Sequence, residues 1–474
     1  MQRATYYTSI LCVICFNITL YAQEQPAGIT ESNSFMLIRP AFMSLSSDQA
    51  TWHELIYNKR IKGGHSFQVK AINQQSISSD QSKQYFLFGC NNSLLVAGDN
   101  TILRSERDVR AEWLGIKNNQ FTGSLTIDPY QKQSGATITY HKDLSTAASF
   151  LDGFWLSLEV PFFSTKHNLN LKQFDIGQTT EQYPNDILSA FSQRSWLYSK
   201  INGPTIANNI LGGFLKFGHT FLSENHFQVI GYSLLNFAFG NGQNARYLFD
   251  AYTGVNRHVG IGGGAHFQIL LNKDASSLAI CWYVGLENQY FFPNVQLRTF
   301  DLKRKPWSRY MLYNHKNKGP NQNIPGVNIL TYQALIRPYS FIDFQTGWRF
   351  ISEKFEFELG YELWGRGNER VKIHSDFQQV FGIAGTNGAS ASESTIANQA
   401  SNDPIFTTFK ESDIDLCSAA ASSALNHKLT CSLGYLKKGV NTDLFFTIGG
   451  ASEYAQKNAA LSVWTIWIKA GATQ

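Results

Sequence analysis

Apolar and polar residues alternate along most of the chain, as they do in β-strands. In the clearest case, residues 355–363, five apolar or aromatic side chains alternate with three glutamates and one glycine. A period of two places the apolar side chains on one face of a strand and the polar side chains on the other. Several of these runs last about 9–12 residues, the length that crosses a bilayer at a tilt.

About fourteen segments show this pattern. They begin near residues 64, 82, 119, 134, 152, 208, 225, 257, 275, 340, 354, 426, 440 and 458. Their apolar faces are large and aromatic, while their polar faces are rich in Gly, Ser, Thr, Gln and Glu, which suits a barrel with lipid outside and water inside. We therefore predict an all-β fold: a transmembrane, antiparallel, up-and-down β-barrel of about fourteen strands. The pattern is compatible with any number of strands from 12 to 18. The alternative is a soluble secreted β-protein, which predicts that the aromatic faces pack inward.

Turn signals divide the barrel region, residues 63–474. Short polar turns alternate with long connections near residues 164–207, 292–339 and 367–425, as periplasmic turns alternate with outer loops. A few short helices are expected within 48–60, 101–116 and 185–200. The N-terminal segment 23–62 either plugs the lumen or forms a periplasmic arm, and the sequence leaves both open.

Residues 1–22 have the order of a secretory signal peptide. Arg3 precedes an apolar stretch from Tyr6 to Leu20, and a polar segment follows Ala22, after which cleavage is expected. The stretch of about 15 apolar residues is shorter than the roughly 20 that a spanning helix needs. We expect export through a cleaved signal peptide.

Composition excludes several classes of protein. Aromatic residues make up 14% of the 474 residues and charged residues 16%, against about 25% charged in a typical soluble protein. Such a low content of charged residues argues against disorder. The net charge of +5 is spread along the chain and is not gathered in a basic patch, which argues against a nucleic-acid partner.

The chain resembles the porin-like outer-membrane β-barrels of Gram-negative-type bacteria. The resemblance rests on the predicted signal peptide, the long amphipathic strands and the high content of aromatic residues. The C-terminal run of the chain, AALSVWTIWIKAGATQ, resembles a final porin strand, with Trp464 and Trp467 expected at the membrane interface. It departs from the family in ending on Gln474 rather than Phe or Trp.

The resemblance implies a bacterial outer-membrane location and passive diffusion of small hydrophilic solutes or ions through a water-filled lumen. It also implies insertion by the barrel assembly machinery and contact with outer-membrane lipid and lipopolysaccharide. Homotrimers are common among porins, although no residue of this chain requires one. Two further functions stay open: a plugged carrier for specific or apolar substrates, and a structural or adhesive surface barrel.

Charged residues on the polar strand faces are the candidate pore lining, because a charge facing lipid is costly. They would tune ion preference, or else form a polar wall without selectivity. The predicted lining residues are Glu159, Glu287, Asp343, Arg349, Glu356, Glu358 and Glu362.

A basic run in the 292–339 connection has two interpretations. Lys303, Arg304, Lys305 and Arg309 either fold inward to oppose the acids at a constriction, or stay in an outer loop that contacts anionic lipopolysaccharide.

No enzyme, cofactor or metal site is predicted. The chain has no GxSxG or HExxH motif, and its cysteines lack metal-ligand spacing. The run from Gly260 to Ala265 matches G-x-G-x-x-A, but the pattern after it predicts a strand, where a dinucleotide site needs a helix.

Overall fold

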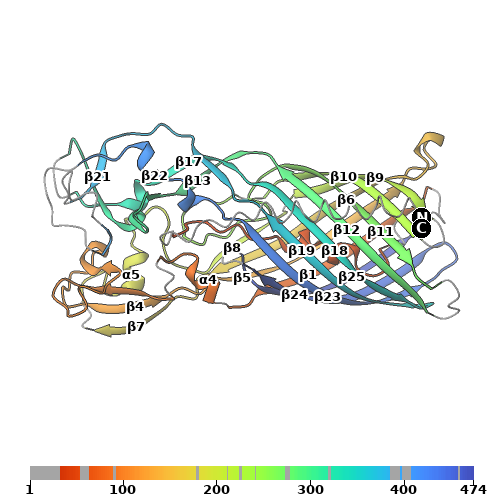
Figure 1. Cartoon of the computed structure of the whole chain (residues 1–474), viewed down its shortest axis with the longest axis horizontal. Helices are drawn as coiled ribbons and strands as arrows, with labels where there is room; N and C mark the ends of the chain where they lie inside the picture. The colour runs from red at the N-terminus through yellow and green to blue at the C-terminus, as the bar shows by residue number, and fades with distance from the viewer. Residues whose placement is uncertain are drawn as a thin grey trace, which may run out of the picture.

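The protein folds into a long β-barrel with a cap of folded loops at one end (Figure 1). The structure is a computed structural model. It describes residues 32–53, 63–78, 80–88, 92–177, 181–210, 212–223, 227–240, 242–272, 278–318, 322–384, 395–397, 407–456 and 460–474.

Among the described residues, twelve antiparallel strands form the closed barrel, and the pairing of β5 with β6 completes the circle. In order around the wall they are β5 (Tyr130–Asp143), β1 (His65–Ser76), β25 (Val463–Thr473), β24 (Asp443–Ala455), β23 (Ala424–Lys437), β19 (Phe355–Arg366), β18 (Tyr339–Ile351), β12 (Ala279–Phe291), β11 (Gly260–Leu270), β10 (Phe227–Ala238), β9 (Gly212–Ser223) and β6 (Phe154–Asn168). A further strand, β8 (Thr205–Ile210), pairs with the end of β6 toward the cap. The predicted antiparallel transmembrane barrel is confirmed.

Two of the fourteen predicted segments lie outside the barrel. The segment near residue 82 begins in a short helix, α4 (Asp80–Gln84), and continues into β2 (Leu94–Ala97). The segment near 119 becomes β4 (Thr122–Thr126), which pairs with β2 and with β7 (Lys172–Gly177). Their apolar residues alternate because they face the core of a small sheet rather than lipid. The strand count is therefore twelve, the lower end of the predicted range.

The apolar faces of the barrel strands point outward. On β19, Phe355 is 52% exposed and Leu359 46%, whereas Glu356 between them is 2% exposed. The same alternation runs along β1 and β23. Exposed apolar side chains around a closed wall need a lipid environment. The protein is therefore a membrane-spanning barrel of the outer-membrane type, and the soluble alternative, with aromatic faces inward, is wrong.

The lipid-facing surface gives a first testable prediction. Replacing Leu359 by arginine should destabilise the barrel by about 2–4 kcal/mol, because the charge would lie against acyl chains near the middle of a strand. Urea titration in lipid vesicles, followed by heat-modifiable electrophoretic mobility, measures this loss. The matched control is Ile102→Arg, on a side chain of the cap that is 96% exposed. Equal stability of the two variants would contradict the assignment of Leu359 to the lipid face.

The cap is built from the long connections between strands. It contains a four-stranded sheet, two three-stranded sheets and a two-stranded pair. Besides β2, β4 and β7, their strands are β3 (Val109–Arg110), β13 (Asn294–Thr299), β14 (Asp301–Leu302), β15 (Leu312–His315), β16 (Ile324–Pro325), β17 (Thr331–Arg337), β20 (Arg370–Ile373), β21 (Phe381–Ile383) and β22 (Ile414–Asp415). The described residues of the three predicted long connections lie mainly in the cap, together with those of connections 77–129 and 239–259, which were not predicted as long.

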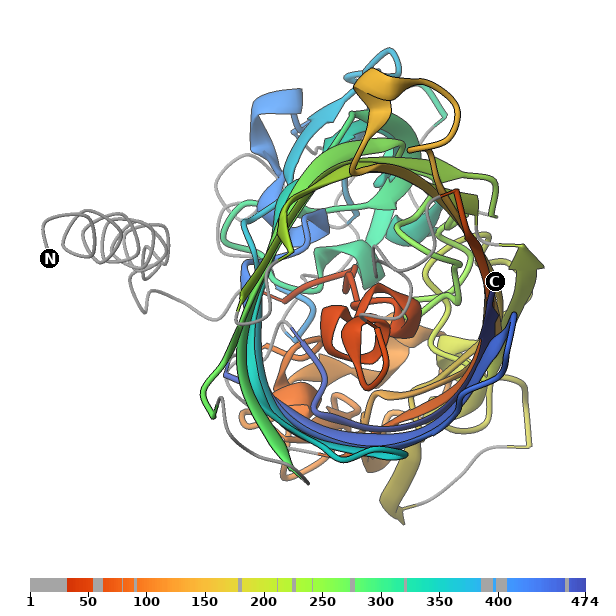
Figure 2. The same ribbon diagram turned by 90° about the vertical axis from the view of Figure 1, so that its right-hand side faces the viewer.

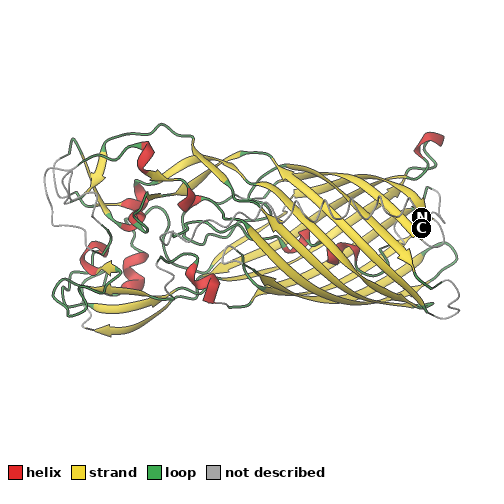
Figure 3. Ribbon diagram, viewed as in Figure 1, coloured by secondary structure: helices red, strands yellow, loops and turns green. Residues whose placement is uncertain are grey.

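Short helices lie in the cap, inside the barrel and in the turn between β5 and β6 (Figure 3). They are η1 (Ala41–Met43), α2 (Leu45–Gln49), η2 (Ala111–Leu114), η3 (Ser149–Leu151), α5 (Ile187–Phe191), η4 (Ser308–Tyr310), η5 (Gly326–Asn328), η6 (Glu411–Asp413) and η7 (Cys417–Ala419). The helix expected within 101–116 is instead turns, β3 and η2. A large hydrophobic core, with Phe86, Trp307 and Tyr313 fully buried, holds the cap together.

Residues 39–53, which we call the lumen segment, lie inside the ring of barrel strands (Figure 2). Phe42 packs on Phe163 and Phe214 of the wall, and the short helices η1 and α2 follow one another down the lumen. Trp467 faces this segment and is 1% exposed, so its expected place at the membrane interface is wrong. Residues 1–31 and 54–62, including the predicted signal peptide, lie outside the described residues.

Candidate functional site

The inner wall of the barrel is polar and charged. All seven predicted lining residues face inward and are at most 9% exposed. They are buried because the lumen segment and neighbouring wall side chains cover them. The lumen of the described protein is therefore filled by its own chain at these positions.

Arg39 of the lumen segment meets three carboxylates of the wall, which we call the acidic cluster: Asp343 of β18, Glu362 of β19 and Glu453 of β24. The guanidinium donates through Nη2 to Asp343 and Glu362, and its Nη1 lies 3.6 Å from Glu453 Oε2. Lys428 of β23 adds a second cation, with Nζ 3.6 Å from Glu362 Oε2 and 3.9 Å from Glu453 Oε2. These groups are brought together because each lies on the inner face of its strand.

Glu362 also receives a hydrogen bond from the start of helix α2. The backbone N–H of Ser46 donates to Glu362 Oε2 over 2.9 Å. A carboxylate near the first turn of a helix is favoured by the unpaired N–H groups there. The acidic cluster therefore binds both the side chain and the backbone of the lumen segment.

A second group of contacts lies nearer the end of the barrel opposite the cap. Arg349 Nε donates to Glu358 Oε2 over 2.9 Å, and its Nη2 donates to the carbonyl of Gln49. Glu356 Oε2 accepts the backbone N–H of Trp52 at 3.1 Å. The predicted lining residues Arg349, Glu356 and Glu358 thus bind the lumen segment or one another.

The lumen segment also contacts side chains of strand β25 and of its neighbours β24 and β1. Lys469 of β25 donates to the carbonyl of Ala50, and the hydroxyl of Thr51 donates to that of Thr447 over 2.8 Å. Lys70 of β1 forms an ion pair with Asp48. Charged wall groups therefore bind this segment at Arg39 and at several positions between residues 44 and 52.

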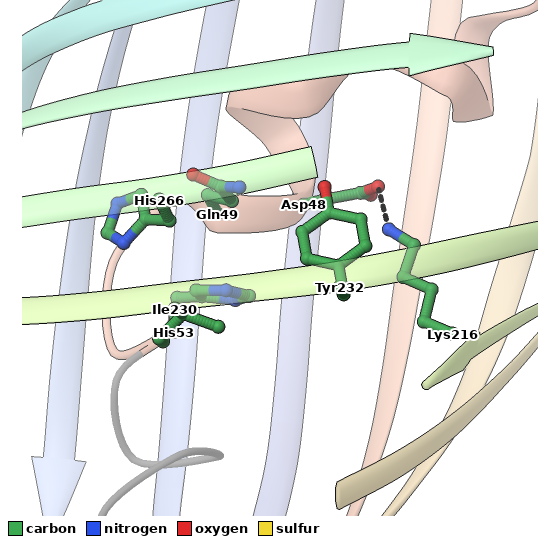
Figure 4. Close-up of a pocket in the computed structure, with 7 residues that line it drawn as sticks. All are labelled: Asp48, Gln49, His53, Lys216, Ile230, Tyr232 and His266. Carbon is green, nitrogen blue, oxygen red and sulfur yellow. Dashed lines mark ion pairs between the residues drawn. The ribbon is translucent and has the colours of Figure 1, made fainter. Parts of the chain in front are cut away.

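A small cavity of about 20 Å³, enough for a single water molecule, remains between the segment and the wall. It is lined by Asp48, Gln49, His53, Lys216, Ile230, Tyr232 and His266 (Figure 4). Lys216 pairs with Asp48 and with the predicted lining residue Glu287, which also accepts the Tyr232 hydroxyl at 2.6 Å. The cavity is polar, and it lies on the β9–β11 side of the lumen.

The cap holds the chain just before the lumen segment. Ser32 donates to Asp301 over 2.8 Å, and Asp301 is also paired with Arg309 at 2.6 Å. Farther along, the Tyr252 hydroxyl accepts the N–H of Ile38, and the Tyr85 hydroxyl donates to the carbonyl of Phe35. Burial raises the pKa of Tyr85 to about 12, so this phenol keeps its proton. Residues 32–38 are therefore fixed in the cap.

The basic run is divided between the surface and the core of the cap. Lys303 and Arg304 are exposed, and Lys305 is partly buried with its pKa lowered by burial. Arg309 is fully buried against Asp301. The cations that oppose the acidic cluster are instead Arg39 and Lys428.

Sequence reasoning predicted Arg349 but missed the other cations of the site, among them Arg39, Lys428 and Lys469. Lys428 and Lys469 alternate with lipid-facing residues on their strands, so the same pattern that placed the glutamates inside carried this signal. Arg39 had no such signal because it lies in an irregular segment. In the part of the chain that the structure describes, no group of three metal-ligating side chains occurs, and no helix has the length and apolar character to cross a bilayer.

Comparison with known proteins shows that this chain is similar to solved structures in its fold only. No protein-family model and no curated protein matches the chain. Among solved structures, an outer-membrane channel from Pseudomonas putida F1 is 9% identical, with 88% of this chain and 98% of that chain covered and a TM-score of 0.38. The transport unit of the autotransporter AIDA-I from Escherichia coli is 8% identical (88% and 91% covered, TM-score 0.32). A FadL homologue from Pseudomonas aeruginosa is 9% identical (94% and 99% covered, TM-score 0.28).

Proposed function

We propose that this protein is a gated outer-membrane channel for small polar solutes or ions, held closed by its lumen segment. The observation that carries this proposal is the dense set of polar contacts between the lumen segment and the wall, which lies beside a smaller apolar contact of Phe42 with Phe163 and Phe214. Arg39, the backbone of residues 46–52 and the wall charges contact one another through ion pairs and hydrogen bonds. Water or a polar solute can replace such contacts, whereas a permanently filled core is better stabilised by apolar packing.

The lumen segment has enough length to move while both of its ends stay attached. The 15 residues of the lumen segment, 39–53, follow the cap-bound residues 32–38 and contact the wall near their other end through Trp52. Fully extended, they span up to about 50 Å. A 12-residue wall strand such as β19 is roughly 40 Å long. This excess length lets the segment shift against one wall without leaving the barrel, so opening needs only a local rearrangement.

A disulfide lock tests the gate. The hydroxyl oxygens of Thr51 and Thr447 are 2.8 Å apart, close to the approach that a disulfide requires. We expect refolded wild type in a planar bilayer to show infrequent conductance steps. The oxidised Thr51→Cys/Thr447→Cys variant should show none, and reduction should restore the wild-type steps.

The single variant Thr447→Cys, oxidised in the same way, is the matched control and should behave as wild type. Steps that persist in the oxidised double variant would contradict gating by the lumen segment. An absence of steps in every variant, including those that weaken the acidic cluster, would instead favour a surface barrel whose working part is the cap. The large hydrophobic core of the cap is the observation that favours this second function.

A further inference from the structure

We propose that the acidic cluster is a binding site for a guanidinium-bearing solute, and that Arg39 occupies it in the closed state as a tethered substitute for that solute. This inference rests on the proposed gate and names the class of solute that opens it. Its argument uses the charge, the geometry and the unused hydrogen-bonding groups of the cluster.

The charge of the cluster favours a cation. Three carboxylates, Asp343, Glu362 and Glu453, are at most 7% exposed, and the cations that contact them are Arg39 and Lys428. When Arg39 moves away, Lys428 is the one cation among the described residues that still contacts these three buried carboxylates. Buried charges need partners, so the vacated site attracts a positive group from the solution.

The geometry favours a planar cation with several donors. Asp343 and Glu362 accept from one nitrogen of the Arg39 guanidinium, and Glu453 lies beside a second nitrogen. The Trp364 ring is 5.6 Å from the guanidinium carbon, within the range of a cation–π contact. Carboxylates around the edge of a guanidinium, with an aromatic ring nearby, match its fork of donors better than they match a compact ammonium.

Arg39 satisfies only part of the hydrogen-bonding capacity of this site. Among the residues that the structure describes, its Nε and Nη1 atoms have no hydrogen-bond partner, and neither do Asp343 Oδ1 and Glu453 Oε2, although all of these atoms are buried. The chain on both sides of Arg39 is held by the cap and by the wall, which restricts how the guanidinium can turn. A free solute has no such restriction and can satisfy the remaining acceptors, so it can compete with the tethered group.

Calorimetric titration with L-arginine tests the site without requiring conduction. The Arg39→Ala variant, refolded in detergent, should bind L-arginine at least about tenfold more tightly than wild type, because wild type must first release its own guanidinium. L-citrulline has nearly the same shape and no charge, and it should bind at least about tenfold more weakly than L-arginine. Adding Glu453→Gln to Arg39→Ala should weaken L-arginine binding about tenfold, whereas Glu411→Gln, on an exposed cap residue, should not.

Bilayer recordings then test the guanidinium site and the gate separately. Millimolar L-arginine should raise the frequency of wild-type openings severalfold, and L-citrulline should not. If Arg39→Ala conducts but binds L-arginine no better than L-citrulline, the guanidinium site is overturned while the gate stands. If it binds L-arginine selectively but never conducts, the site stands and the gate fails. Equal binding of L-arginine to wild type and Arg39→Ala would place the solute elsewhere and overturn the inference.

Discussion

Replacing Arg39 by alanine should open the channel. The substitution removes a guanidinium that is buried among three carboxylates, and breaking a buried ion pair in this way costs about 3–5 kcal/mol. The cost falls on the closed state, because in the open state water solvates the same carboxylates. At about 1.4 kcal/mol per factor of ten, the ratio of open to closed channels should rise roughly 100-fold or more. Single-channel recording of the refolded variant in a planar bilayer measures this ratio directly.

Two further variants show whether the effect depends on the guanidinium of Arg39. Arg39→Lys keeps the charge but loses the planar fork, so its opening should lie between those of wild type and Arg39→Ala. Arg194→Ala removes an exposed arginine of the cap and should leave the recordings unchanged. An Arg39→Ala channel that folds but opens no more often than wild type would show that the acidic cluster does not control closure.

The positions of the lumen charges could be predicted from sequence because the rule that places them is local. Lipid excludes charge, and a strand reverses its side chains at every residue, so Glu356 and Glu358 had to face inward wherever their strand lay in the wall. The same rule applied to Trp467, since Lys469 two residues later shares its face. Its assignment to the membrane interface followed the family pattern rather than the alternation, and the alternation was the better guide.

The partners of these charges could not be predicted, because they come from distant parts of the chain. Arg39 meets Glu362 across 323 residues, and no local pattern encodes that contact. The cap was missed for a related reason. Alternation near residue 121 indicates one apolar face, but it does not say whether lipid or protein covers that face. The length of β4, 5 residues, distinguishes the two, since it is too short to cross a bilayer.

The second large effect is expected at the cap, where Asp301 holds the chain that enters the lumen. Asp301 accepts hydrogen bonds from Ser32, from the backbone N–H of Arg309 at 2.9 Å and from the Arg309 guanidinium. In Asp301→Ala, Arg309 stays fully buried without its counter-charge, which should destabilise the cap by about 3–5 kcal/mol. Limited proteolysis should then cleave the cap at least tenfold faster than in wild type, while the barrel strands stay protected. Channel openings should also become more frequent, because residues 32–38 lose one of their attachments.

A double variant separates loss of the ion pair from loss of a side chain. Replacing Arg309 by methionine as well removes the unpaired charge and keeps an unbranched side chain of comparable length, so Asp301→Ala/Arg309→Met should recover most of the protease resistance. Its channel openings should nevertheless stay more frequent than in wild type, since the Ser32 hydroxyl still lacks Asp301. Asp376→Ala, on an exposed cap residue, serves as the control and should match wild type in both measurements. If Asp301→Ala resists protease as well as this control does, the buried pair does not hold the cap in place, and the attachment of the lumen segment must depend on the Tyr252 and Tyr85 hydroxyls instead.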